Sequence, residues 1–69
     1  MREVRIVVRP RSQVQRDIAN TEYALKNAEQ AREEALRVGD TRAIARGDQN
    51  VAAAESQLRR LRQELGRTR

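Results

Sequence analysis

Arginine is the residue of this sequence best suited to chemistry. Fourteen arginines and one lysine supply the fifteen basic residues, against ten acidic ones. The guanidinium group is planar and presents its N–H donors in a fixed fork, which matches the geometry of a carboxylate or a phosphate. Ten arginines lie in the terminal segments 1–16 and 59–69, together with only two acids, so we predict an anion-docking surface there. The predicted docking residues are Arg2, Arg5, Arg9, Arg11, Arg16, Arg59, Arg60, Arg62, Arg67 and Arg69.

The charge distribution along the chain separates two explanations for these arginines. Ten arginines against two acids give the terminal segments a net charge of +8, whereas five basic and eight acidic residues give the remainder −3. Compensation of the helix dipole explains arginines near a helix C-terminus, such as Arg59 and Arg60, but not Arg11 and Arg16 near a helix N-terminus. An anionic partner explains both groups. A GC-rich genome would also favour arginine over lysine, so the preference for arginine leaves both explanations open.

Side chains for catalysis are nearly absent. Without histidine or cysteine, the chain lacks the commonest general base, the thiol nucleophile and the usual zinc ligands. Glu33 and Glu34 are adjacent, and neighbours on a helix point about 100° apart, so they cannot converge on one substrate atom. We expect Glu33 to pair with Arg37 instead, four residues further on. The sequence therefore predicts no enzyme, no catalytic or metal-binding residues, no cofactor and no small-molecule substrate.

A heptad repeat of small and apolar residues runs through both halves of the chain. If the chain reverses at residues 38–40, the two rows face each other, and large residues mostly face small ones, as Leu58 faces Thr21. This pattern predicts an all-α fold, an antiparallel two-helix coiled-coil hairpin with helices at about 12–38 and 41–65. The seam residues are Val14, Ile18, Thr21, Leu25, Ala28, Arg32 and Ala35 in the first half, and Ile44, Gly47, Val51, Ala54, Leu58, Leu61 and Leu65 in the second.

The ends of the predicted helices have recognisable capping residues. Ser12 and Gln15 have the spacing of a capping box, in which each side chain bonds to the backbone N–H of the other residue. Gly39 can adopt the left-handed conformation that ends a helix, and Asp40 can cap the next one. The second helix is expected to end at Gly66.

Gly47 and Asp48 are the weak point of the second helix. A glycine in a helix interior costs about 1 kcal/mol relative to alanine, and Asp48 could cap a new helix, so a break is one interpretation. We favour a continuous helix, because the heptad phase passes from Ile44 to Val51 without slipping. Gly47 would also face Arg32, where the missing side chain leaves room for the arginine stem.

Residues 1–10 form a basic arm ahead of the hairpin, which spans residues 11–69. Within the arm, residues 3–9 alternate in the manner of a β-strand, with Val4, Ile6 and Val8 on one face. Pro10 ends this strand. A single strand leaves its backbone groups unpaired, so we expect it to pair with a strand of a partner or of another copy.

The positions beside the seam differ between its two edges. Four acids, Glu22, Glu29, Asp48 and Glu55, line one edge and repel one another, so a basic group is expected to cover them. The other edge has small or apolar residues, which widen the apolar stripe and allow a second hairpin or a foreign helix to approach. These residues are Ala24, Ala31, Val38 and Ala43.

Tyr23, the only aromatic residue, falls on the outward face of the first helix in this register. A solvated side chain and a partner-contact residue are both open interpretations, since tyrosine is enriched at the energetic centres of interfaces.

Taken as a whole, the sequence predicts a non-enzymatic assembly or adaptor protein. A two-helix hairpin of this length buries little apolar surface, so we expect a homo-oligomer or a larger protein assembly. The alternative is a small nucleic-acid-binding protein that contacts phosphates through the basic open end of the hairpin. We expect no membrane partner, because the basic segments lack Trp and Phe, and a cytoplasmic location, because the N-terminus lacks a secretory apolar run.

Overall fold

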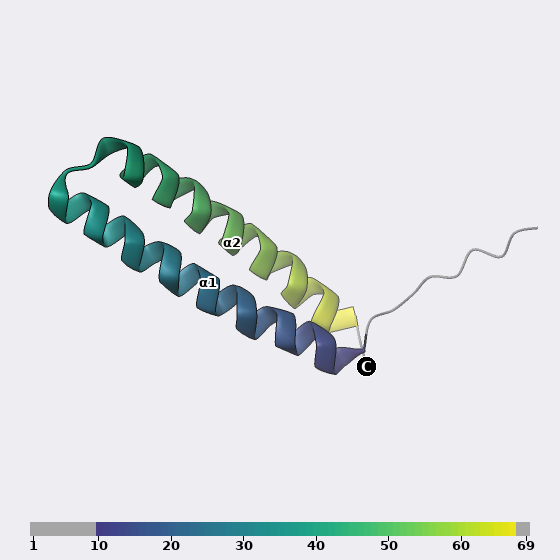
Figure 1. The fold of residues 1–69 in the computed structure, drawn as a ribbon. Helices are drawn as coiled ribbons and strands as arrows, with labels where there is room; N and C mark the ends of the chain where they lie inside the picture. Colours follow the sequence, from purple (N-terminus) through teal and green to yellow (C-terminus); the bar gives the residue numbers. More distant parts are fainter. Residues whose placement is uncertain (1–9, 68–69) are drawn as a thin grey trace, which may run out of the picture.

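The computed structural model describes residues 10–67, and this part of the chain consists of two α-helices. α1 spans Arg11–Val38 and α2 spans Thr41–Arg67. The helices run antiparallel and pack against each other along their length (Figure 1), which confirms the predicted helical hairpin. α2 does not end at Gly66 but at Arg67, two residues beyond the predicted range of 41–65. The strand predicted for residues 3–9 lies outside the described residues.

α1 begins at Arg11 with Pro10 as its N-cap. Pro10 has a ψ of 144°, and its carbonyl accepts hydrogen bonds from the N–H groups of Gln13 and Val14 at 3.0 and 3.2 Å. No side chain caps this end of α1, so the capping box predicted for Ser12 and Gln15 is wrong. The physical reason is the position of Ser12. Once Pro10 is the cap, Ser12 lies inside the first helical turn and its hydroxyl cannot serve as the N-cap acceptor.

The turn between the helices consists of Gly39 and Asp40. Gly39 ends α1 in the left-handed region, with φ 74° and ψ 28°, where a residue with a Cβ atom would be strained. The Asp40 N–H donates to the Ala35 carbonyl at 3.0 Å, and the Asp40 carboxylate accepts from the Ala43 N–H at 3.2 Å. The predicted roles of both residues are confirmed, and together they reverse the chain in two residues.

The heptad positions form the interface between the helices. Every one of them is buried or half-buried except Arg32. Thr21 is the only buried polar residue at these positions, and its hydroxyl donates to the Asp17 carbonyl at 2.7 Å, so burial leaves it satisfied. The buried positions are Val14, Thr21, Ala35, Gly47, Ala54, Leu58 and Leu61, and the half-buried ones are Ile18, Leu25, Ala28, Ile44, Val51 and Leu65.

α2 is continuous through Gly47, as predicted. A Cβ atom at this position would lie 2.9 Å from the Cβ and 3.2 Å from the Cα of Arg32. Both distances are shorter than ordinary contacts, and neither atom can move without the backbone of α1. Gly47 is therefore the point where the two helices approach too closely for any side chain on α2.

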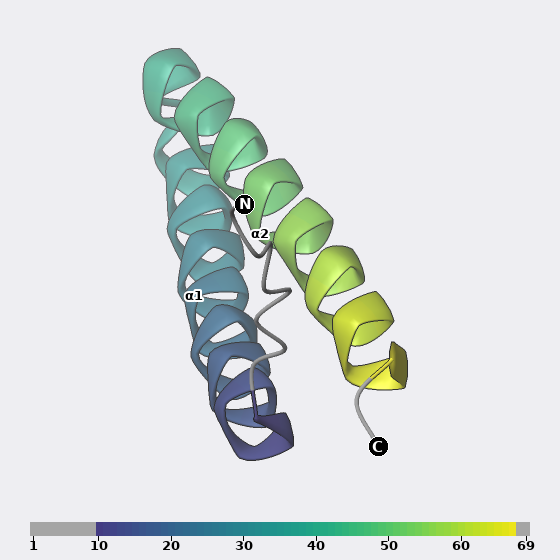
Figure 2. The ribbon, with the colours of Figure 1, turned by 90° about the vertical axis from the view of Figure 1, so that its right-hand side faces the viewer.

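The described helices form a single layer. Figure 1 shows α1 and α2 side by side, the perpendicular view in Figure 2 shows them inclined to each other, and no third helix of the described residues covers either face of the pair. Each helix therefore packs on one side only. The buried apolar residues of the described range are five, namely Val14, Ala35, Ala54, Leu58 and Leu61.

Candidate interaction surfaces

The open end of the hairpin brings together the start of α1 and the end of α2 (Figure 1). Six of the ten predicted docking residues lie in the described range, and all six are exposed: Arg11, Arg16, Arg59, Arg60, Arg62 and Arg67. The other four, Arg2, Arg5, Arg9 and Arg69, lie outside it. The fold therefore gathers arginines from both ends of the chain at one end of a rod.

Most of these open-end arginines keep their charge available. Among the described residues, no ion pair involves Arg16, Arg59, Arg62 or Arg67. Arg60 makes a long hydrogen bond of 3.5 Å to the Ser56 hydroxyl, which leaves its charge unneutralised. These guanidinium groups can bind an external phosphate or carboxylate without first breaking an internal ion pair.

Ion pairs occur instead in the middle of the hairpin and near the turn. Arg32 Nε lies 2.6 Å from Asp48 Oδ1, so a seam arginine of α1 neutralises one acid of the acidic edge on α2. Arg37 pairs with Glu34 at 3.3 Å, so the predicted pairing with Glu33 is wrong. Both spacings suit a helix, but the observed Arg37 rotamer reaches the acid three residues back.

The outward face of α2 carries arginines along more of its length than the charges of the chain segments indicate. Positions turned away from the seam hold arginines near the turn as well as near the open end, namely Arg42, Arg46, Arg59, Arg60 and Arg67. Arg42 and Arg46 belong to the part of the chain between the terminal segments, which has a net charge of −3, although the acids of α2 all flank the seam. The heptad register contained the signal, because Arg46, Arg60 and Arg67 share one register position.

A groove of about 700 Å³ runs along the edge opposite the acids. The predicted contact residues Ala24 and Ala31 line it, together with Ala53 of α2. Four amide side chains that sequence reasoning did not single out also line it, and no charged residue does. These amides are Asn20, Asn27, Asn50 and Gln57.

Three other apolar or aromatic side chains are exposed on the hairpin. Tyr23 is 69% exposed on α1, and Leu36 and Val38 near the turn are also largely exposed. The remaining predicted contact residues, Val4, Ile6 and Val8, lie outside the described range.

Residues 10–67 lack two further kinds of site. This part of the chain holds no cluster of acids that could bind a metal ion. Neither helix has a stretch long and apolar enough to traverse a lipid bilayer.

Comparison of the chain with models of known protein families, with curated proteins and with solved structures finds no match. The surfaces described above are therefore interpreted from their own chemistry.

Proposed function

We propose that this chain is a non-enzymatic assembly or adaptor protein, whose hairpin associates with further helices and whose arginine-rich open end docks on an anionic partner. The observation that carries this proposal is the open groove beside a very small core. Five buried apolar residues provide little stabilisation for a chain of this size, since domains normally bury two packed layers. A second layer of helices would supply what the hairpin lacks.

The groove has the composition that helix docking requires. Ala24, Ala31 and Ala53 are small, so the backbone of another helix can approach closely. The amide side chains beside them both donate and accept hydrogen bonds, so they can pair with the same groups on a second copy. Because the lining has no charged residue, association there buries no charge and brings no like charges into direct contact.

The open end adds the second part of the proposal. Its exposed arginines come from both helices, and most are free of ion pairs within the described residues. An adaptor needs one surface for assembly and another for its target, and the groove and the open end are distinct surfaces. The alternating residues Val4, Ile6 and Val8 add a proposed strand-pairing arm on the sequence pattern alone.

Sedimentation velocity at micromolar concentration tests the assembly surface. The variant Ala24→Glu/Ala31→Glu places two charges in the groove, whereas Ala19→Glu/Gln30→Glu places two on exposed positions of the same helix outside it. We expect the native chain and the control to sediment as oligomers and the groove variant as a monomer. A monomeric native chain, or equal behaviour of the two variants, would contradict the proposal.

A further inference from the structure

The outward face of α2 carries arginines near the turn and near the open end, with no acid between them. In a frame of 3.5 residues per turn, Arg42, Arg46, Arg60 and Arg67 fall within an arc of about 50° on the side opposite the seam. Arg59 flanks this row. The three acids of α2, Asp48, Glu55 and Glu64, all occupy positions beside the seam, so none interrupts the row. We call these four arginines the α2 arginine row.

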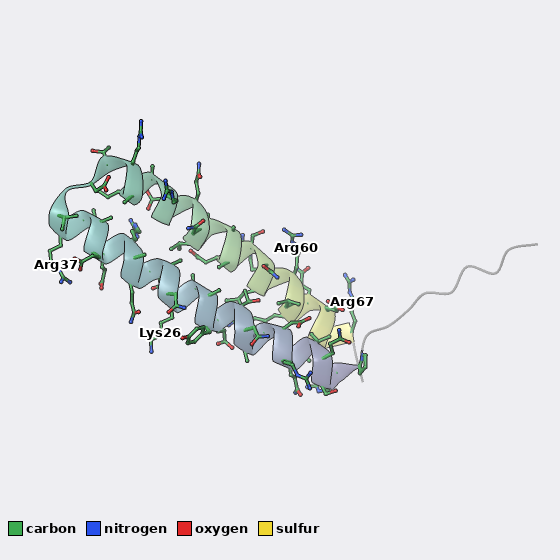
Figure 3. The ribbon with its side chains drawn as sticks, in the orientation of Figure 1. Lys26, Arg37, Arg60 and Arg67 are labelled. Atoms are coloured by element: carbon green, nitrogen blue, oxygen red, sulfur yellow. The ribbon has the colours of Figure 1, made fainter. Side chains whose placement is uncertain are left out.

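The outward face of α1 is different in kind. It mixes Arg16, Lys26 and Arg37 with Glu33 and Glu34, and Arg37 is already paired with Glu34. Figure 3 shows Lys26 and Arg37 projecting from α1 on one side of the hairpin, and Arg60 and Arg67 from α2 on the other. Outward-facing arginines with no acid between them therefore belong to one face of the hairpin and not to the molecule as a whole.

The α2 arginine row is available to a ligand. All four residues are exposed, and none forms an ion pair with a described residue. Arg60 bonds only to the Ser56 hydroxyl, at 3.5 Å. Mutual repulsion along such a row costs folding free energy, and no ion pair among residues 10–67 neutralises any of the four arginines.

The spacing of the row suits a long, straight anion. At about 1.5 Å per residue, Arg46 lies about 6 Å along the helix from Arg42, Arg60 about 21 Å beyond Arg46, and Arg67 about 10 Å beyond Arg60. The whole row covers about 37 Å, close to the roughly 34 Å length of one turn of duplex DNA. The long interval holds small or uncharged side chains at the same register positions, namely Gln49, Ala53 and Ser56.

We propose that the α2 arginine row is a docking surface for duplex nucleic acid, with α2 lying against the phosphate backbones. The inference rests on the anionic docking proposed for the open end and extends that surface along α2 to the turn. Two arginine pairs about 21 Å apart can reach the phosphates on the two sides of a major groove about 12 Å wide. The uncharged side chains between them place no acid against the phosphates.

Other anionic partners fit this row less well. A duplex presents one negative charge per about 1.7 Å over the whole length, which a folded acidic protein rarely does. A lipid surface would need apolar side chains to insert between the arginines, and the row has only Ala53 there. Single strands are usually held by stacking on aromatic rings, which this face lacks.

Binding of the full chain to a fluorescent duplex of about 24 base pairs of random sequence tests the proposal, since this length exceeds two helical turns. Anisotropy titrations between about 50 and 200 mM salt give the slope of log affinity against log salt concentration. The variant Arg42→Gln/Arg46→Gln removes two charges near the turn, far from the open end. Its matched control, Lys26→Gln/Arg37→Gln, removes two charges from the outward face of α1.

We expect the slope to fall by about 1.8 in Arg42→Gln/Arg46→Gln, because each phosphate contact contributes about 0.9 on duplex DNA. The slope of the α1 control should equal that of the native chain. Circular dichroism should show unchanged helicity in both, since all four positions are exposed. Equal slopes in the two variants would overturn the proposal, because net charge alone would then explain binding.

A third variant, Arg59→Gln/Arg62→Gln, separates this inference from the proposed function. If it lowers the slope whereas Arg42→Gln/Arg46→Gln does not, docking is confined to the open end and the α2 arginine row is overturned. If the native chain binds polyglutamate but not the duplex, the nucleic-acid ligand is overturned and anionic docking stands. Absence of binding to either polymer at about 50 mM salt would contradict both.

Discussion

α1 and α2 share one seam but contribute differently to each side of it. α2 buries the large side chains of Leu58 and Leu61, whereas the buried residues of α1 are the smaller Val14, Thr21 and Ala35. Outside the seam, α1 is a mixture of amides and charges of both signs, and α2 has the arginine row. The difference shows that a heptad pattern sets which faces pack together, while the outward positions are free to take on function.

The largest expected effect tests the unequal burial of the two helices. Leu58→Ala or Leu61→Ala should lower the free energy of unfolding by about 2–4 kcal/mol, because each leaves a cavity at a nearly fully buried position. Leu25→Ala, at a half-buried position of α1, should cost less. Urea denaturation at fixed protein concentration measures all three. Equal losses would mean that the two helices share the core evenly.

At Gly47 the larger side chain of the seam belongs to α1, because Gly47 of α2 lies against the stem of Arg32. Gly47→Ala should destabilise the hairpin by about 1–2 kcal/mol despite the higher helix propensity of alanine, because its Cβ would overlap the Arg32 backbone. Gly66→Ala is the matched control, as nothing lies within 4 Å of its Cβ position. Thermal melts that rise in both variants would show that the helices can separate at no cost.

The two helix N-termini should respond differently to removal of a hydroxyl or a carboxylate. Asp40→Ala should cost about 1 kcal/mol, because it removes the bond to the Ala43 N–H at the start of α2. Ser12→Ala should change stability by less than about 0.5 kcal/mol, since Ser12 caps nothing. Chemical denaturation distinguishes these values. If Ser12→Ala lowered the free energy of unfolding by about 1 kcal/mol, Ser12 would be a capping residue after all.

The smallest expected effect concerns the ion pair that joins the helices. A double-mutant cycle with Arg32→Gln and Asp48→Asn should give a coupling free energy of about 0.3–1 kcal/mol, because both side chains are about half exposed. The coupling should weaken at high salt. A salt-independent coupling well above this range would mean that the pair is screened from solvent in the assembled protein.

The hairpin was predictable because several independent signals agreed. The heptad rows, the left-handed Gly39 and the cap at Asp40 each favoured the same chain reversal. The placement of Gly47 opposite Arg32 favoured a continuous α2. The start of α1 was predicted to within one residue, but its cap was not, because the spacing of Ser12 and Gln15 suggested a capping box whereas Pro10 is the N-cap.

The surfaces were only partly predictable. Ala24 and Ala31 were found from their register, but the amides beside them were missed because polar residues next to a seam look like ordinary solvated positions. Arg42 and Arg46 were missed because charge was summed along segments of the chain, whereas a helix sorts charge by face. The choice of Glu34 over Glu33 by Arg37 depends on a side-chain rotamer, which spacing does not determine.

The two-residue turn has a consequence for the order in which the hairpin forms. Near the turn the seam consists of Ala35, Ile44 and Gly47, whereas Val14, Leu58 and Leu61 lie near the far end. The seam contacts near the turn have the lowest entropic cost of loop closure, but they are also the weakest. The strongest contacts join residues that are distant along the chain, which raises the contact order. Folding should therefore be cooperative and not a zipper from the turn. Each doubling of the length of the turn would lower the stability of the hairpin by only about 0.6 kcal/mol. The contacts at the open end therefore contribute more to holding the helices together than the shortness of the turn does.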